Sequence, residues 1–242
     1  MKNPFHMILR FFLFPIAHVL FPCRVMDKDK YVKYDGGQII VSNHLSWMDF
    51  AYHIFWIPGY KRALSKKENE GSKLQHWFLK KIGVMFINRE KPELSAMRDC
   101  INALKAGDAI SIFPEGTRNR VNREIQQMHS GAAMFAIKGE AGVVPVVVHH
   151  KGKIGKRNYI GVGDRIDISD LYGKRTDEHI LQDAMDRFRA GMESTLAALD
   201  KWVEEKGWKK DKKLKRKNKR ALKKQYRSAK KQARKAAKGK NA

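Results

Sequence analysis

The stretch QIIVSNHLSWMDFAYHIFW, residues 38–56, contains the pattern that decides the fold. Its apolar start, residues 38–42, predicts a buried strand, and residues 49–56 predict the helix that follows it. The loop between them places His44 and Asp49 five positions apart. A histidine in a loop is more often structural than catalytic, so this spacing alone leaves open whether the two residues form an acid–base pair.

On the C-terminal side of this stretch, the chain keeps alternating strands with helices. Apolar runs predict further strands at residues 84–88, 109–113 and 143–148. Helical spacing of apolar residues predicts helices at residues 76–83, 92–106, 131–139 and 176–202. A short strand pair is expected at residues 159–163 and 165–169. This order is typical of an α/β domain with a largely parallel mixed sheet flanked by helices.

Two polar clusters follow directly after predicted strands, at residues 43–49 and 114–120. Parallel sheets bind their ligands outside the carboxyl ends of the strands. We therefore expect the two clusters to share one site.

The N-terminal 25 residues are the most apolar part of the chain, but Arg10, Pro15, His18 and Pro22 interrupt them. A membrane-spanning helix needs about 20 predominantly apolar residues, which this segment does not offer without interruption. We interpret it as a helical segment embedded in or lying on a membrane, with a buried core helix as the alternative.

The net charge of +25 is concentrated at the C-terminus. Residues 206–242 hold 19 of the 50 Lys and Arg residues and a single acid, Asp211. An anionic membrane surface and nucleic acid are both plausible partners for such a tail. The lack of interleaved aromatic residues and the apolar segment at the other end favour the membrane, so no nucleic-acid partner is expected. The chain thus divides into an anchoring segment (1–30), a folded domain (31–205) and a polybasic tail (206–242).

Only two cysteines occur, Cys23 and Cys100, and neither lies in a CxxC or Cys/His cluster. A disulfide framework is therefore not expected, and a reducing compartment is the natural interpretation. The adjacent His149 and His150 end a predicted strand, where neighbouring side chains face opposite ways. No metal site is expected.

Four sequence blocks, in this order and spacing, resemble the glycerolipid acyltransferase superfamily over roughly residues 35 to 165. They are N-H-x-S-x-x-D at 43–49, a glycine, strand and arginine at 83–89, F-P-E-G-T-R at 113–118 and V-P-V at 144–146. The chain departs from the family at His129, two positions before Gly131, where the family usually has another basic residue.

The resemblance implies an enzyme that moves a fatty acyl group from a thioester to the free hydroxyl of 1-acyl-glycerol 3-phosphate, giving phosphatidic acid for phospholipid biosynthesis. His44 is expected to act as the general base and Asp49 to orient its ring. Because the hydroxyl of the substrate is the nucleophile, the enzyme needs none of its own. The expected phosphate-binding residues follow: Arg118 as a planar fork, Gly116 for close backbone approach, Thr117 as a hydroxyl donor, and Arg89. Glu115 is expected either to fix Arg118 or to contact a substrate hydroxyl.

No cofactor is implied beyond the acyl donor, which is acyl-CoA or acyl carrier protein. The implied partners are lysophosphatidic acid, that donor and an anionic membrane surface. The expected location is the cell membrane, peripheral or monotopic, with the active site on the cytoplasmic side. Two alternatives stay open: another acceptor such as glycerol 3-phosphate or a different lysophospholipid, and a non-catalytic basic membrane- or RNA-binding protein on the same scaffold.

Overall fold

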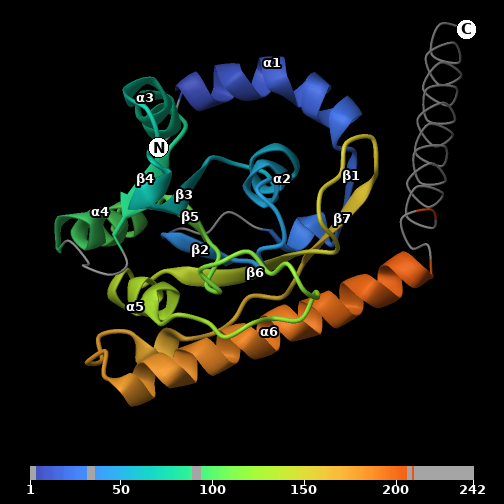
Figure 1. Cartoon of the computed structure of the whole chain (residues 1–242). Helices are drawn as coiled ribbons and strands as arrows, with labels where there is room; N and C mark the ends of the chain where they lie inside the picture. The colour runs from blue at the N-terminus through green and yellow to red at the C-terminus, as the bar shows by residue number, and fades with distance from the viewer. Residues whose placement is uncertain (1–3, 32–35, 89–93, 206–208, 210–242) are drawn as a thin grey trace, which may run out of the picture. The chain divides into compact units, whose positions relative to one another are not determined.

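The computed structural model describes residues 4–31, 36–88, 94–205 and 209 (Figure 1). The chain forms two compact units, Met1–Asp200 and Lys201–Ala242. Among the described residues, all the strands and most of the helices belong to the first unit. The predicted polybasic tail lies outside the described residues, apart from Lys209.

The first unit has the predicted α/β architecture. Its strands are β1 (Cys23–Met26), β2 (Gln38–Val41), β3 (Lys61–Lys66), β4 (Val84–Ile87), β5 (Ala109–Ile112), β6 (Gly142–Val148) and β7 (Asn158–Val162). The helices are α1 (Pro4–Leu20), α2 (Asp49–Trp56), α3 (Lys73–Lys81), α4 (Leu94–Lys105), α5 (Gly131–Lys138) and α6 (Glu178–Glu204), which continues past Asp200. Short 3-10 turns lie at Lys28–Lys30, Lys67–Asn69 and Ser169–Leu171.

Seven strands form one mixed sheet in the order β1-β7-β6-β2-β5-β3-β4. Every neighbouring pair is parallel except β6 and β7, which run antiparallel. Strand β2 lies between β6 and β5, and all four of its residues are buried. Because both faces of β2 are buried, its sequence is a continuous apolar run after Gln38 and does not alternate between apolar and polar residues. The loops after β2, β5 and β6 consequently meet at one edge of the sheet.

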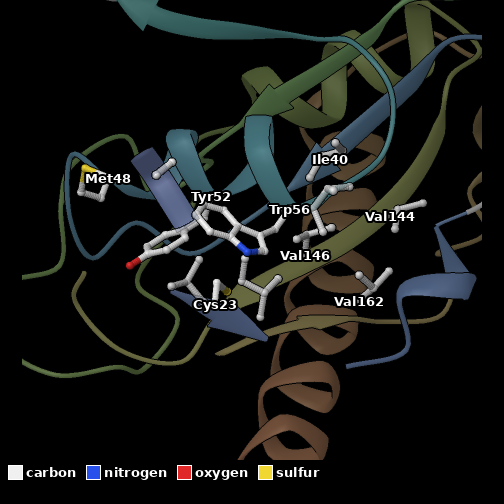
Figure 2. Packing of buried hydrophobic residues seen from close by; sticks show 12 residues of the cluster. Cys23, Ile40, Met48, Tyr52, Trp56, Val144, Val146 and Val162 are labelled. Atoms are coloured by element: carbon white, nitrogen blue, oxygen red, sulfur yellow. The ribbon is translucent and has the colours of Figure 1, made fainter. Parts of the chain in front are cut away.

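Helices cover both faces of the sheet. Helices α1 and α2 lie on one side, and α5 and the part of α6 up to Asp200 lie on the other (Figure 1). Figure 2 shows Tyr52 and Trp56 of α2 packed over β6 and β1, against Val146 and Cys23. A second apolar cluster joins α1 and α3 to strands β3 and β4. These two clusters fix α2, and therefore its first residue Asp49, against the sheet.

The predicted strand at residues 165–169 is wrong. Only Ile166 forms an isolated bridge, to Val143, while β7 pairs with β6 and β1 instead. The reason is local: Asp167 accepts hydrogen bonds from both the amide and the hydroxyl of Ser169, at 2.9 and 2.8 Å. Such side-chain bonds compete with a strand ladder and turn the chain into the 3-10 turn that follows.

The N-terminal segment contains α1 and also β1, which pairs with β7 inside the sheet. Among the described helices, none combines the length and apolar character needed to cross a membrane. Helix α1 nevertheless exposes a row of large apolar side chains, namely Met7, Ile8, Phe11, Phe12, Ile16 and Val19. Both cysteines are buried and free.

Candidate active site

The loop between β2 and α2 is tied directly to the neighbouring strand β6. The side-chain amide of Asn43 donates to the carbonyl of Val148 at 2.9 Å, and its carbonyl accepts from the Val148 amide at 2.8 Å. Asn43 is fully buried. The pair of bonds imitates one rung of a strand ladder and fixes the start of the loop that carries His44.

Asp49, the first residue of α2, is buried and fully satisfied. Its Oδ2 accepts from the amides of Leu45 and Ser46, both at 2.7 Å, and its Oδ1 accepts from the Ser46 hydroxyl at 2.8 Å. The fourth partner is His44, whose Nδ1 lies 2.9 Å from Oδ2. A buried carboxylate is costly unless it is hydrogen-bonded, and here the loop supplies every donor.

This contact sets the protonation pattern of the His44 ring. Because the Asp49 carboxylate accepts, Nδ1 carries the proton and Nε2 keeps its lone pair. The side chain of His44 is 22% exposed while that of Asp49 is fully shielded. The arrangement leaves the histidine partly accessible to solvent and shields the carboxylate that orients it.

An aromatic stack supports the ring from the neighbouring strand. Phe113, just after β5, stacks on His44 with centroids 4.2 Å apart and planes at 20°. The buried His53 of α2 stacks on Phe113 at 5.7 Å, and its Nδ1 lies 2.7 Å from the Ser111 hydroxyl. Burial lowers the pKa of His53 to about 3, so this second ring is neutral. The stack restricts rotation of the His44 ring out of its present orientation.

The F-P-E-G-T-R segment folds against the same loop, as its position after a parallel strand predicted. Gly116 adopts a positive φ of 72° and donates its amide to the Phe113 carbonyl. The amide of Asn119 donates to the backbone carbonyl of His44 at 2.6 Å. The buried Asn119 side chain also accepts from two later amides, those of Val121 and Asn122. The two polar clusters thus form one site.

Glu115 is buried beside this pair, with 3% exposure, and neither carboxylate oxygen has a hydrogen-bond partner of good geometry among the described residues. Burial raises the pKa of Glu115 to about 7; the nearby His44 backbone opposes the shift and the charge of Asp49 adds to it. No ion pair joins Glu115 to Arg118 in the described part of the chain. The expected contact with Arg118 is therefore not formed, and contact with a substrate hydroxyl stays a prediction.

The remaining predicted binding residues lie at the surface. Thr117 and Arg118 are exposed, directly before the buried Asn119 that anchors the segment. His129 is exposed too, and its amide donates to the Pro114 carbonyl, so it belongs to the same loop system. Arg89 falls outside the described residues. In the described ranges, no three His, Cys, Asp or Glu side chains gather as a metal ion requires.

Sequence reasoning missed the supporting residues of the site. Asn43 and Phe113 stood inside the quoted motifs, yet nothing in their spacing indicated a bond to Val148 or a stack on His44. Asn119 lay inside the polar cluster 114–120 without a role of its own, and His53 had no motif signal. Each depends on a partner brought close by the sheet, so only the fold reveals it.

Comparisons with known proteins agree on one family. The model of the family described as "Acyltransferase" matches residues 24–149, just over half of the chain. The 1-acyl-sn-glycerol-3-phosphate acyltransferase of Streptococcus pneumoniae is 29% identical over 194 residues, covering 77% of this chain and 69% of that protein. The protein of the same name from Bacillus subtilis is 33% identical over 112 residues, covering 46% of this chain and 55% of its own length.

A solved structure supports the fold. The crystal structure of the 1-acyl-sn-glycerophosphate acyltransferase PlsC from Thermotoga maritima aligns with a TM-score of 0.57 over 78% of this chain and 77% of that one. At 20% sequence identity, this likeness speaks for the shared fold alone.

Proposed function

The chain belongs to the acyltransferase family, and we propose that it transfers a fatty acyl group from an acyl thioester to the free hydroxyl of 1-acyl-glycerol 3-phosphate, giving phosphatidic acid. The observation that carries this proposal is the His44–Asp49 pair at the carboxyl edge of the sheet, in which Asp49 is shielded and the His44 side chain is 22% exposed. The names of the similar proteins from Streptococcus pneumoniae and Bacillus subtilis support the choice of acceptor.

The proposed reaction uses His44 as the base. Nε2 takes the proton of the acceptor hydroxyl while the oxygen attacks the thioester carbonyl, forming a tetrahedral intermediate. The C–S bond then breaks, the ester forms, and the imidazolium returns its proton to the departing thiolate. Asp49 stabilises the transient imidazolium across its 2.9 Å contact and does not itself need to accept a proton, because its other lone pairs are already used.

Arg118 supplies the charge for the acceptor phosphate in this proposal. Its guanidinium is exposed one residue before Asn119, whose amide is bonded to the backbone of His44. A planar guanidinium binds two phosphate oxygens at once. Thr117 and the backbone at Gly116 contribute further donors, and Arg89 has the same proposed role. Burial raises the pKa of Glu115 to about 7, so a substantial fraction of its carboxyl groups is protonated near neutral pH and can donate a hydrogen bond to a substrate oxygen.

The reaction as proposed needs no cofactor other than the donor thioester, which is acyl-CoA or acyl carrier protein. We also propose that the protein is attached to one side of the cell membrane through the exposed apolar row of α1, with its site on the cytoplasmic side. The two free cysteines are compatible with a reducing compartment.

The test is product identification with the full chain in detergent micelles. The protein is incubated with lysophosphatidic acid, glycerol 3-phosphate, monoacylglycerol and other lysophospholipids. Each acceptor is tested with acyl-CoA and with acyl carrier protein that carries the acyl thioester. Mass spectrometry should find phosphatidic acid as the main product, and none with His44→Ala. A preference for glycerol 3-phosphate would correct the acceptor, and no acyl transfer with any pair would refute the enzyme assignment in favour of a binding protein.

A further inference from the structure

The loop between β6 and β7 is strongly basic and plays no part in the proposed chemistry. We call residues 149–157, HHKGKIGKR, the basic loop. It contains four Lys and Arg residues and no acid. The loop begins where Asn43 holds Val148, at the same edge of the sheet as the catalytic pair.

The cationic side chains of the basic loop surround a hollow beside the active site. A cavity of about 360 Å³ is lined by Arg123, Lys151, Lys153 and Lys156, with Leu45, the neighbour of His44, also in its wall. Arg123 is neutralised by Asp200 at 3.0 Å. None of the three lysines pairs with a carboxylate in the part of the chain that the structure describes. The hollow therefore carries uncompensated positive charge.

The tip of the basic loop adds an apolar element and joins the exposed helix α1. Ile154 is 73% exposed between Lys153 and Lys156. The amide of Gly155 donates to the carbonyl of Leu20, the last residue of α1, at 2.7 Å. In Figure 1 this loop, drawn in yellow, lies beside the end of α1. The tip of the basic loop is thus bonded to the end of the helix that carries the exposed apolar row.

An exposed apolar side chain flanked by lysines fits the boundary between lipid tails and headgroups. Each lysine near an anionic bilayer contributes attraction of its own. An acidic protein would satisfy the charge as well, but it would give no reason for the loop to continue into the apolar helix. The geometry points to a lipid surface.

We propose that the basic loop binds the headgroups of anionic phospholipids, so that the hollow beside Leu45 opens toward the bilayer surface. The inference rests on the proposed function in that a lipid acceptor makes such an orientation useful. The product of that reaction is itself an anionic phospholipid, and its headgroup has the chemistry that the loop would bind.

The test compares two charge-matched variants of the full-length protein. The loop variant carries Lys151→Gln, Lys153→Gln and Lys156→Gln. The control variant carries Lys105→Gln, Lys138→Gln and Lys174→Gln; Lys105 and Lys138 end α4 and α5, at the opposite edge of the sheet. Both lose three charges, so any general effect of net charge is equal. Binding is measured by flotation with phosphatidylcholine vesicles and with vesicles in which about a third of the lipid is phosphatidylglycerol.

The loop variant should bind the anionic vesicles at least about tenfold more weakly than the wild type, and the control variant within about twofold. Binding to neutral vesicles should be the same for all three proteins. Inorganic phosphate should weaken binding no more than sodium chloride of the same ionic strength. Equal losses in both variants, or specific displacement by phosphate, would overturn the proposal.

Turnover in detergent micelles separates this proposal from the enzymatic one. Equal turnover of wild type and loop variant with both donors is expected, because the lysines are assigned to the membrane and not to the reaction. A loss confined to the acyl carrier protein donor would make the basic loop a protein-docking surface and refute the lipid assignment. Absence of turnover in the wild type would refute the proposed function while leaving the vesicle result to stand by itself.

Discussion

Nδ1 of His44 lies 2.9 Å from Oδ2 of Asp49, and the same carboxylate accepts three further hydrogen bonds from the loop that carries the histidine. The proposed base and its orienting carboxylate are therefore parts of one closed turn at the start of α2. Their geometry does not depend on a substrate to assemble it, which is the condition for an efficient proton acceptor.

Replacing the members of this pair should have graded effects. His44→Ala should abolish turnover, and Asp49→Asn should reduce kcat by roughly 10²- to 10⁴-fold, because the amide disturbs the tautomer and no longer stabilises imidazolium. Ser46→Ala removes one of four bonds to Asp49 and should cost much less. Steady-state rates in micelles, with circular dichroism to verify folding, decide the matter; near-normal turnover by His44→Ala would refute the assignment.

Arg118→Ala should raise the KM for lysophosphatidic acid at least about tenfold and change kcat little, because a phosphate contact present throughout the reaction contributes uniform binding. The neighbouring exposed Arg120 provides the matched control, and Arg120→Ala should leave KM nearly unchanged. Monoacylglycerol has no phosphate, so the slow rate of its acylation should be the same in the wild type and in Arg118→Ala. An equal loss for charged and neutral acceptors would assign Arg118 to the donor or to the fold.

Glu115→Gln should make the protein less sensitive to pH. The native state holds the Glu115 proton more tightly than the unfolded chain does, since burial raises its pKa from 4.5 to about 7. The free energy of unfolding of the wild type should therefore fall as pH rises from about 4.5 to about 7, by up to about 3 kcal/mol.

The glutamine variant lacks this titration. It should be more stable than the wild type at pH 8, and the difference should shrink toward pH 5. Denaturant unfolding at the two pH values measures both effects. A parallel pH dependence in the two proteins would show that Glu115 is ionised in the native state across this range.

Phe113→Leu should lower kcat about fivefold by removing the ring that stacks on His44, an interaction of roughly 1 kcal/mol in aromatic pairs. Phe86→Leu is the matched control, because Phe86 stacks on His76 at 5.3 Å outside the site. Both variants should lose similar stability in thermal unfolding, but only the first should lose turnover. Equal turnover of the wild type and Phe113→Leu would mean that the hydrogen bond to Asp49 alone orients His44.

Phe11→Ser combined with Phe12→Ser should release the protein from neutral vesicles at about 1 M salt, where charge attraction is screened. Both rings are more than half exposed on α1, so their loss removes membrane contact and little core packing. The control is Leu94→Ser at the start of α4, an equally exposed apolar position. Unchanged membrane binding in the double variant would place the anchor elsewhere. Deletion of the first 25 residues is a poorer test, because it removes most of β1 from the sheet.

The sequence predicted the order of strands and helices where apolar runs were long, as in β2 and β6. It missed β3, which reads KRALSK, because its first residue breaks the apolar pattern. Lys61 is nonetheless buried, and its ammonium group donates to the carbonyls of Ile57, Pro58 and Gly59 at 2.8–2.9 Å. Those acceptors belong to a loop whose shape no local pattern indicates. Strand β1 was missed for a similar reason, since four residues after a proline carry little signal until β7 pairs with them.

The sequence predicted which candidate residues lie together at the site, but not the residues that support them. His44, Asp49 and the F-P-E-G-T-R segment stand close together in the chain or follow neighbouring strands, so motif and topology were sufficient. Asn43, His53, Phe113 and Asn119 act through partners that only the folded sheet brings near. Contacts between residues so far apart in the sequence produce no periodic pattern of residues from which they could be predicted.

The bonds between Asn43 and Val148 connect residues that stand 105 positions apart. During synthesis the loop bearing the base is complete long before its attachment point leaves the ribosome, and contacts of such long range form late in folding. A nascent or truncated chain that ends before β6 therefore carries every reacting residue named here without the rung that fixes them. The attachment of the His44 loop to the sheet is thus completed only when β6 has been added beside β2.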